Sequence, residues 1–201
     1  MRLAVLASGN GSNLQAIIDA ANREEISGSV AVVFSDKEES FALERARRHG
    51  IEALFLNPGH YSHREAYDSD VVYLLREREI ELVILAGFMR LLSPHFVEQY
   101  RGRIMNIHPA LLPSFPGVDG VKQALRYGVK VSGCTVHFVD EGLDTGPIIL
   151  QEAVKVYDND TEESLQERIH KVEHRLYPRA VQLFIEGRLR VEERRCFIDE
   201  E

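Results

Sequence analysis

Short apolar runs alternate with amphipathic stretches through the first half of the chain, and this pattern constrains the fold more than any other feature. The runs LAVLAS, VAVVFS, EALFLN, ELVILAG and RIMNIH have the length of strands and are apolar on both faces. Helical spacing lies between them, as in Leu14, Ile17, Ile18 and Ala21. Strands buried on both faces and alternating with helices predict an open, mostly parallel twisted sheet with helices on both faces, which is an α/β, Rossmann-like fold.

The pattern changes beyond residue 130. Strands are predicted at about 131–139 and 148–156, joined by the loop DEGLDTGP, so the sheet should end in an antiparallel C-terminal extension. A long helix is predicted from about Thr161, where TEES is a capping signal. The chain shows no repeat and no linker, and we predict a single domain over residues 1–201.

Composition narrows the possible partners. The chain has 201 residues, 44% of them hydrophobic, which is enough for one well-buried core. A net charge of -8 argues against nucleic acid as a partner, because such proteins need a basic face. The isolated Cys134 and Cys196 have neither zinc-ligand spacing nor a disulfide pattern. No run is long enough for a signal peptide or a membrane span, and we predict a cytoplasmic protein without a membrane partner.

The sequence SGNGSNLQ lies between the first strand and the first helix. Gly9 and Gly11 allow a tight turn, and Ser12 and Asn13 are predicted to cap the helix with their N–H groups directed outward. Leu14 stands where a dinucleotide fingerprint has its third glycine, and no Gly-Lys-Ser/Thr follows for a Walker loop. The loop therefore favours a single phosphate at the helix N-terminus over an ordinary turn or a dinucleotide site.

The segment MNIHPALLPSFPG places two polar side chains at the end of a buried strand. Asn106 and His108 are two residues apart, so an extended backbone directs both to one face. Pro109 keeps His108 extended, and the two later prolines stiffen the loop. A structural histidine is the plain alternative, but the amide on the same face, at the carboxyl end of a strand, favours a site.

A second polar group occurs in TVHFVDEGLDTGP. Thr135 and His137 share one strand face, and Asp140, Glu141 and Asp144 lie in the following loop. A carboxylate next to an imidazole favours its protonated form and orients it. The loop lacks the ligand spacing of a calcium site, and an ordinary solvated turn is the other reading.

Together these residues supply an amide, a histidine and a carboxylate without an evident nucleophile or metal cluster. This set suits direct acyl transfer between two bound substrates. Asn106 and a protonated His108 would stabilise the oxyanion, and His108 and Asp144 would handle protons.

Four motifs, SGNGSNLQAIIDA, LAGFMRLLSP, NIHPALLPSFPG and HFVDEGLDTGPII, resemble the phosphoribosylglycinamide formyltransferase family, and IHKVEHRLYP extends the resemblance over nearly the whole chain. These are folate-dependent enzymes of purine biosynthesis. The resemblance implies transfer of a formyl group from the co-substrate 10-formyltetrahydrofolate to the amine of 5'-phosphoribosylglycinamide, without a metal. It also implies a phosphate-binding half at 1–100 and a catalytic and folate-binding half at 101–201.

The resemblance assigns roles to individual residues. The catalytic set is Asn106, His108 and Asp144, with His137 and Thr135 in support. Ribonucleotide binding falls to Gly11, Ser12, Asn13, His170 and Glu173, although some members of the family have lysine where this chain has His170. Folate binding falls to Arg64, Met89, Arg90, Leu91, Leu92, Asn106, Val139, Asp140, Glu141, Gly142, Leu143 and Asp144.

Two other functions stay open at this point. A deformylase of the same chemistry would deliver the formyl group to water, and a non-catalytic module would only bind folate or nucleotide. In each case the expected partners are small molecules, and the expected assembly is a monomer or a weak homodimer.

Overall fold

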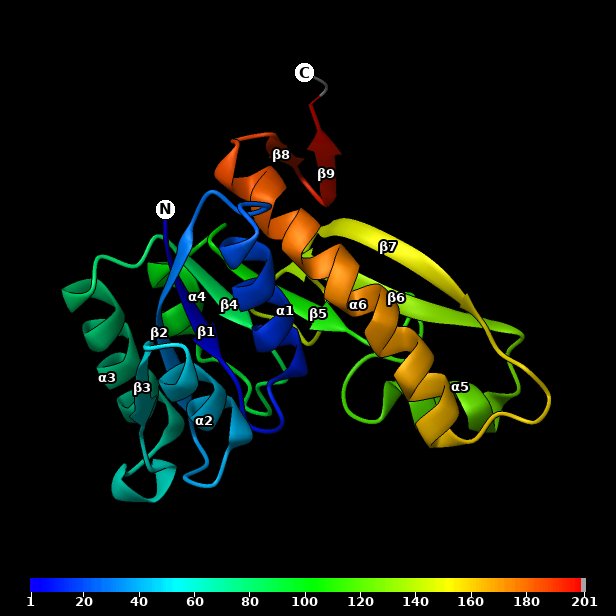
Figure 1. Cartoon of the computed structure of the whole chain (residues 1–201), viewed down its shortest axis with the longest axis horizontal. Helices are drawn as coiled ribbons and strands as arrows, with labels where there is room; N and C mark the ends of the chain where they lie inside the picture. The colour runs from blue at the N-terminus through cyan, green and yellow to red at the C-terminus, as the bar shows by residue number, and fades with distance from the viewer. Residues whose placement is uncertain (200–201) are drawn as a thin grey trace.

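The computed structural model of the chain describes residues 1–199, which form a single mixed sheet flanked by helices (Figure 1). Within this range the sheet has the strand order β3-β2-β1-β4-β5-β6-β7-β9-β8. The strands are β1 (Arg2–Leu6), β2 (Ser29–Ser35), β3 (Glu52–Phe55), β4 (Leu82–Leu85), β5 (Ile104–His108), β6 (Val131–Phe138), β7 (Ile148–Lys155), β8 (Leu189–Glu192) and β9 (Arg195–Ile198). The helices are α1 (Ser12–Asn22), α2 (Phe41–Arg48), the 3-10 helix η1 (Pro58–His60), α3 (Arg64–Glu77), α4 (Pro94–Gln99), α5 (Gly120–Tyr127) and α6 (Glu162–Ile185).

Strand direction confirms the predicted fold class. Strands β1 to β5 are parallel to their neighbours, whereas β6 pairs antiparallel with β5 and β7 pairs antiparallel with β6. The parallel part places the carboxyl ends of β1, β4 and β5 at one edge of the sheet, where the loops that follow them meet.

Two hydrophobic clusters fill the spaces on the two sides of the sheet. Leu3, Val5, Met105 and Ile107 pack on the side of α1, α2 and α6, and this cluster includes buried Leu165 and Ile169 of α6. The alternate residues, such as Ala4, Leu6 and Ile104, pack on the side of α3 and α4. Helices α3 and α4 cover one face of the parallel strands, and the second cluster ends at Ile104 of β5. The rest of that face of β5 and the adjoining face of β6 are therefore free to form a site.

Helix α6 begins as predicted. Thr161 is its N-cap, and Ser164 completes the capping box: the Thr161 side chain accepts from the Ser164 N–H at 3.2 Å, and the Ser164 side chain accepts from the Thr161 N–H at 3.0 Å. Tyr177 extends from this helix through the core, with its hydroxyl 2.9 Å from the carbonyl oxygens of Leu85 and Met105. These contacts fix the last helix against the strands that carry the site.

Four elements besides the 3-10 helix η1 were not predicted from the sequence. Helix α4 has six residues and α5 has eight, which is too short for helical periodicity to stand out. Strands β8 and β9 have four residues each, are largely exposed and join the sheet through one parallel pair, Ile148 and Arg195. No helix within residues 1–199 is long and apolar enough to cross a membrane.

Candidate active site

A cleft of about 600 Å³ opens on the face of β5 and β6 that the helices leave uncovered. Asn13, His170 and Glu173 line one end, Met89 to Leu92 line the other, and Asn106, His108, His137 and Asp144 lie among the lining residues. Its volume is within the range of small-molecule sites, roughly 300 to 1,000 Å³.

Strand register brings the polar side chains together. Asn106 pairs with His137 and His108 pairs with Thr135 across the β5–β6 ladder, so all four lie on one face. Ile104 on the same face belongs to the α3–α4 cluster, whereas Met105 and Ile107 point to the opposite core. The spacing of two residues noted in the sequence thus has the predicted result.

The hydrogen bonds of His137 fix its tautomer. Its Nδ1 lies 2.8 Å from the carbonyl oxygen of Phe138 and therefore carries the hydrogen. Its Nε2 then accepts from Asn106 Nδ2 at 3.2 Å. Burial lowers the pKa of His137, which favours this neutral form. One hydrogen of the Asn106 amide is thereby used, and the other stays available.

His108 lies between a carbonyl and a carboxylate. Its Nε2 donates to the carbonyl oxygen of Phe115 at 2.7 Å, and its Nδ1 lies 3.4 Å from Asp144 Oδ2. The same carboxylate oxygen accepts from the Gly117 N–H at 2.7 Å, and Asp144 Oδ1 lies 3.7 Å from His137 Nε2. The imidazole is 4% exposed, so its orientation is set by these partners.

The proline-rich loop after β5 is fastened to β6 through Thr135. The Thr135 hydroxyl donates to the carbonyl oxygen of Ala110 at 2.7 Å and accepts from the Leu112 N–H at 3.0 Å. Gln151 of β7 donates to the same hydroxyl at 2.9 Å and to the carbonyl oxygen of Leu112 at 2.8 Å. Thr135 is fully buried and holds the loop that carries Phe115 and Gly117 in place.

The glycine-rich loop differs from the prediction in one respect. Gly11 is the N-cap of α1, with φ +73°, while Ser12 begins the helix and no side chain caps it. The prediction that Ser12 and Asn13 cap the helix was therefore wrong, because glycine alone fits this left-handed position next to α2 without strain. A Cβ at Gly11 would lie 2.8 Å from Ala42 Cβ. The first-turn N–H groups have no intrahelical partner and can receive an anion.

Asn13 connects the loop to α6 instead of capping α1. Its Nδ2 donates to Glu173 Oε2 at 2.8 Å, across 160 positions of sequence. Glu173 is 3% exposed, and burial raises the pKa of its carboxyl while the hydrogen bond from Asn13 opposes this shift. The buried Asn13 Oδ1 has no hydrogen-bond partner within the described residues, which leaves a polar atom for a ligand at this end of the cleft.

Positive charge surrounds the glycine-rich loop. Arg45 of α2 donates through Nε to the carbonyl oxygen of Asn10 at 2.9 Å and through Nη2 to Asn10 Oδ1 at 3.0 Å. His170 and His174 stack on α6 with ring centroids 6.0 Å apart. Burial lowers the pKa of His174, and His170 and Arg45 contribute in the same direction, which favours the neutral form of this ring. The positive charge of Arg45 and the first-turn N–H groups of α1 are therefore the features of this end that suit an anion.

The loop after β4 forms an apolar slot at the other end. Leu92 and Phe88 are buried, whereas Met89 is 69% exposed at the rim. The Met89 N–H donates to Ser8 Oγ at 2.9 Å, which ties this loop to the first one. The Arg90 guanidinium lies 4.6 Å above the Tyr67 ring, and its buried Nε has no partner among residues 1–199.

Several residues assigned from the resemblance lie outside the cleft lining. Arg64 begins α3 and is exposed, and Glu141 is exposed and pairs with Arg101 at 3.3 Å. Gly11 and Ser12 come directly before Asn13 in the sequence but do not line the cleft. Thr135 lies behind the cleft and holds the proline-rich loop after β5. The remaining assigned residues line the cleft: Asn13, Met89, Arg90, Leu91, Leu92, Asn106, His108, His137, Val139, Asp140, Gly142, Leu143, Asp144, His170 and Glu173.

Sequence reasoning missed the contributions of Phe115, Gly117 and Gln166. The first two act through backbone groups that carry no side-chain signal, and Gln166 lines the cleft from one turn before His170. Within residues 1–199 no group of three or more His, Cys, Asp or Glu side chains is arranged to hold a metal ion.

The fold and the site define a class: an α/β protein whose polar cluster lies between a glycine-rich loop at a helix N-terminus and an apolar slot. The family model described as formyl transferase matches residues 1–181, and the chain belongs to this family.

Individual relatives are similar over nearly the whole chain. The phosphoribosylglycinamide formyltransferase of Escherichia coli K12 is 46% identical over 199 residues, which are 99% of this chain and 94% of the relative. The crystal structure of glycinamide ribonucleotide transformylase 1 from Symbiobacterium toebii is 51% identical with a TM-score of 0.98, and the match covers 100% of this chain and 94% of that one. A formyltetrahydrofolate deformylase from Pseudomonas syringae is 28% identical with a TM-score of 0.91, and the match covers 99% of this chain but 66% of that one.

Proposed function

We propose that the chain transfers the formyl group of 10-formyltetrahydrofolate to the amine of 5'-phosphoribosylglycinamide, a step of de novo purine biosynthesis. The observation that carries this proposal is the position of Asn106, His108 and Asp144 between an anion-binding end and an apolar slot of one cleft. The similarity to the Escherichia coli formyltransferase supports the same substrates.

The ribonucleotide fits the end of the cleft formed by the glycine-rich loop and α6. The first-turn N–H groups of α1, from Gly11 to Asn13, would hold the phosphate, with the helix dipole behind them. The Asn13 side chain would donate or accept hydrogen bonds at the hydroxyls and the amine of the ribonucleotide, and the Glu173 carboxylate would accept them. His170 would supply positive charge when protonated. Its position is the one where, by the resemblance, some members of the family have lysine.

The folate fits the other end. A flat pterin needs apolar walls with a few polar groups at its edge, and the slot offers Leu92, Val139 and Leu143 together with the unpartnered Nε of Arg90. When bound, 10-formyltetrahydrofolate would supply the formyl group, and tetrahydrofolate would leave once the bond between its nitrogen and the formyl carbon is broken. Arg64 and Glu141, outside the lining, are proposed to contact only the exposed tail of the folate.

The polar cluster is proposed to stabilise charge as the amine attacks. Asn106 has one amide hydrogen to donate to the developing oxyanion, because the other is used by His137. His108 is held through Nε2 by Phe115, so Nδ1 is the nitrogen that gives or receives a proton. Asp144 Oδ2, 3.4 Å from Nδ1, orients the imidazole and offers a route for the proton lost by the amine.

A formyl-transfer assay with purified protein tests the proposal. Incubation with 10-formyltetrahydrofolate and 5'-phosphoribosylglycinamide should give the formylated ribonucleotide, and His108→Gln should reduce the rate at least a hundredfold. The fold shared with the Pseudomonas syringae deformylase makes hydrolysis the second candidate, and formate release without the amine substrate would support it. Binding of both ligands without either product would indicate a non-catalytic module.

We further propose a cytoplasmic enzyme with small-molecule substrates, without metal, nucleic acid or membrane partners, as a monomer or weak homodimer. The phosphate-binding half at 1–100 and the catalytic and folate-binding half at 101–201 belong to the same proposal. Sedimentation equilibrium over a range of concentrations measures the assembly state.

A further inference from the structure

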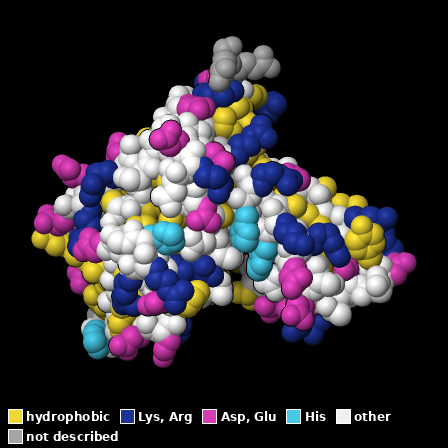
Figure 2. Space-filling view, in the orientation of Figure 1, with side chains coloured by type: hydrophobic (Ala, Val, Ile, Leu, Met, Phe, Trp, Pro, Cys, Tyr) yellow, Lys and Arg dark blue, Asp and Glu magenta, His cyan; other side chains and the backbone are white. Residues whose placement is uncertain are grey.

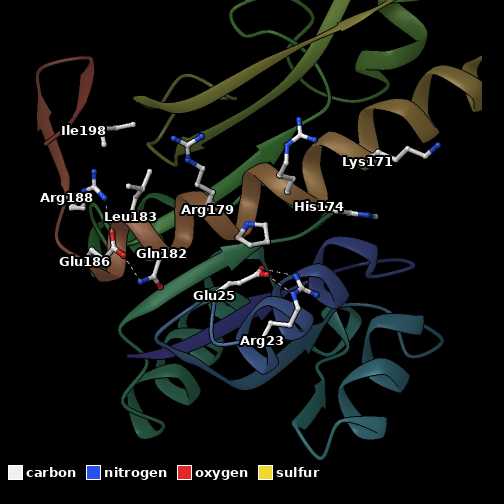
Figure 3. A pocket seen from close by; sticks show the side chains of 12 residues that line it. Arg23, Glu25, Lys171, His174, Arg179, Gln182, Leu183, Glu186, Arg188 and Ile198 are labelled. Carbon is white, nitrogen blue, oxygen red and sulfur yellow. Dashed lines mark hydrogen bonds and ion pairs between the residues drawn. The ribbon is translucent and has the colours of Figure 1, made fainter. Parts of the chain in front are cut away.

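A second hollow of about 570 Å³ lies over the outer face of α6, apart from the catalytic cluster. Its walls come from α6, from the end of α1 and from the C-terminal hairpin of β8 and β9. Figure 3 shows Lys171, His174 and Arg179 along α6, with Arg23 and Glu25 across from them and Ile198 at the far end.

The lining of this hollow is basic although the protein as a whole is acidic. Five cations line it, against the two carboxylates Glu25 and Glu186, while the whole chain has a net charge of -8. The cations are Arg23, Lys171, Arg175, Arg179 and Arg188. Figure 2 shows Lys, Arg and His side chains gathered over α6 on this face.

Three of these cations form one row on the helix. Lys171, Arg175 and Arg179 are spaced four residues apart, and like charges at this spacing destabilise a helix. Arg175 pairs with Glu152 of β7, but Lys171 and Arg179 have no hydrogen-bond or ion-pair partner within the described residues. The helix dipole does not account for the row, because its effect is confined to the last turn, which begins after Arg179.

Apolar surface and a segment beyond residue 181 complete the hollow. Pro178, Leu183 and Ile198 line it beside the cations, so a ligand with an uncharged ring has contacts available. The match to the family model ends at residue 181, and five lining residues lie beyond it: Gln182, Leu183, Glu186, Arg188 and Ile198. This hollow is therefore built in part by a segment that the family model does not include.

We propose that this hollow binds a small polyphosphate-bearing molecule, in the class of nucleoside triphosphates. Lys171 and Arg179 are eight residues apart, about 12 Å along the helix axis at 1.5 Å per residue. An extended chain of phosphates reaches both cations without forcing the two side chains to converge, whereas a single phosphate does not. Arg23 exchanges its ion pair with Glu25 for a phosphate oxygen, and the base or another ring packs on the apolar part.

Calorimetry with tripolyphosphate and with ATP, at constant ionic strength, tests this proposal independently of formyl transfer. Lys171→Glu and Arg179→Glu, each alone, should weaken binding at least tenfold. The matched control is Arg126→Glu on α5, an exposed arginine with the same change of charge, and it should leave affinity within twofold. Melting temperatures of all variants verify that they are folded.

Three outcomes would overturn the proposal. The first is that the wild-type protein binds tripolyphosphate and ATP no more tightly than sulfate. The second is that Arg126→Glu weakens binding as much as Arg179→Glu, which indicates a diffuse charge effect. The third is that 5'-phosphoribosylglycinamide displaces the polyphosphate, which places the polyphosphate in the cleft. Binding of an acidic peptide but not of tripolyphosphate would likewise reject a small-molecule site in favour of a protein partner.

Discussion

The replacement Asp144→Asn isolates the charge of the carboxylate from its shape. Asp144 has φ +53°, a left-handed conformation that asparagine adopts about as readily as aspartate. The Asn carbonyl oxygen can take the place of Oδ2 and keep the hydrogen bond from the Gly117 N–H, now 2.7 Å long. The loop should therefore stay in place, and the change reports on the negative charge 3.4 Å from His108 Nδ1.

The expected loss follows from the role of that charge. Acid–base assistance contributes about 10² to 10⁴ in rate, equivalent to roughly 3 to 5 kcal/mol of transition-state stabilisation. Because the interaction is strongest in the transition state, we expect kcat to fall at least a hundredfold while the KM values of both substrates change less than threefold.

The assay compares initial rates of formyl transfer with those of a control outside the cleft. Asp158 is exposed and pairs with Lys130, so Asp158→Asn makes the same chemical change away from the polar cluster. Its kcat should stay within threefold of wild type. A kcat of Asp144→Asn near that of the control would refute the catalytic role and leave Asp144 as a turn residue.

Three further predictions address the two ends of the cleft. Gly11→Ala puts a Cβ 2.8 Å from Ala42 Cβ at φ +73°, so calorimetry should show at least tenfold weaker ribonucleotide binding with folate binding unchanged; equal loss for both ligands contradicts a local phosphate site. Met89→Ala removes apolar surface at an exposed rim and should raise the KM for the folate about fivefold without lowering the melting temperature, whereas an unchanged KM argues against the slot. Glu173→Gln should raise the melting temperature at pH 8 by removing a buried charge while keeping an acceptor for Asn13. Burial raises the pKa of the Glu173 carboxyl above its ordinary 4.5, so the stability of the wild-type protein falls as pH rises through the pKa of the folded state. The gain in melting temperature of Glu173→Gln should therefore shrink toward pH 4.5. A gain that does not depend on pH contradicts a buried charge at Glu173.

The parallel part of the fold could be predicted because its signal is local. Strands β1, β2 and β4 are apolar on both faces and are separated from their neighbours in the chain by helices or turns. Thr161 marks the start of α6 through its own hydrogen bonds. Helices α4 and α5 could not be predicted, since one or two turns do not establish a period and Ser93 and Asp119 precede them in loops of irregular sequence. The β8–β9 hairpin has strands of four residues with mostly exposed side chains, and the alternation in LRVE is too short to mark a strand.

The candidate site was predictable where neighbours in sequence share a strand face. Asn106 with His108, and Thr135 with His137, follow directly from the period of two. His108 is oriented by the carbonyl oxygen of Phe115 and by Asp144, which the Gly117 N–H holds in place. Backbone groups are common to every residue, so the sequence gives no signal for these contacts. The partnership of Asn13 with Glu173 depends on how α6 packs against α1, which no local pattern specifies.

The hydrogen bond between Asn13 and Glu173 also has a consequence for folding during synthesis on the ribosome. The phosphate loop is synthesised before its partner, which follows 160 positions later. Synthesis at about 5 to 20 residues per second leaves that end of the cleft without its second wall for roughly 10 to 30 seconds. A nascent chain therefore has no complete ribonucleotide site to offer, and competence to bind arrives only when the last helix leaves the exit tunnel and docks on the first.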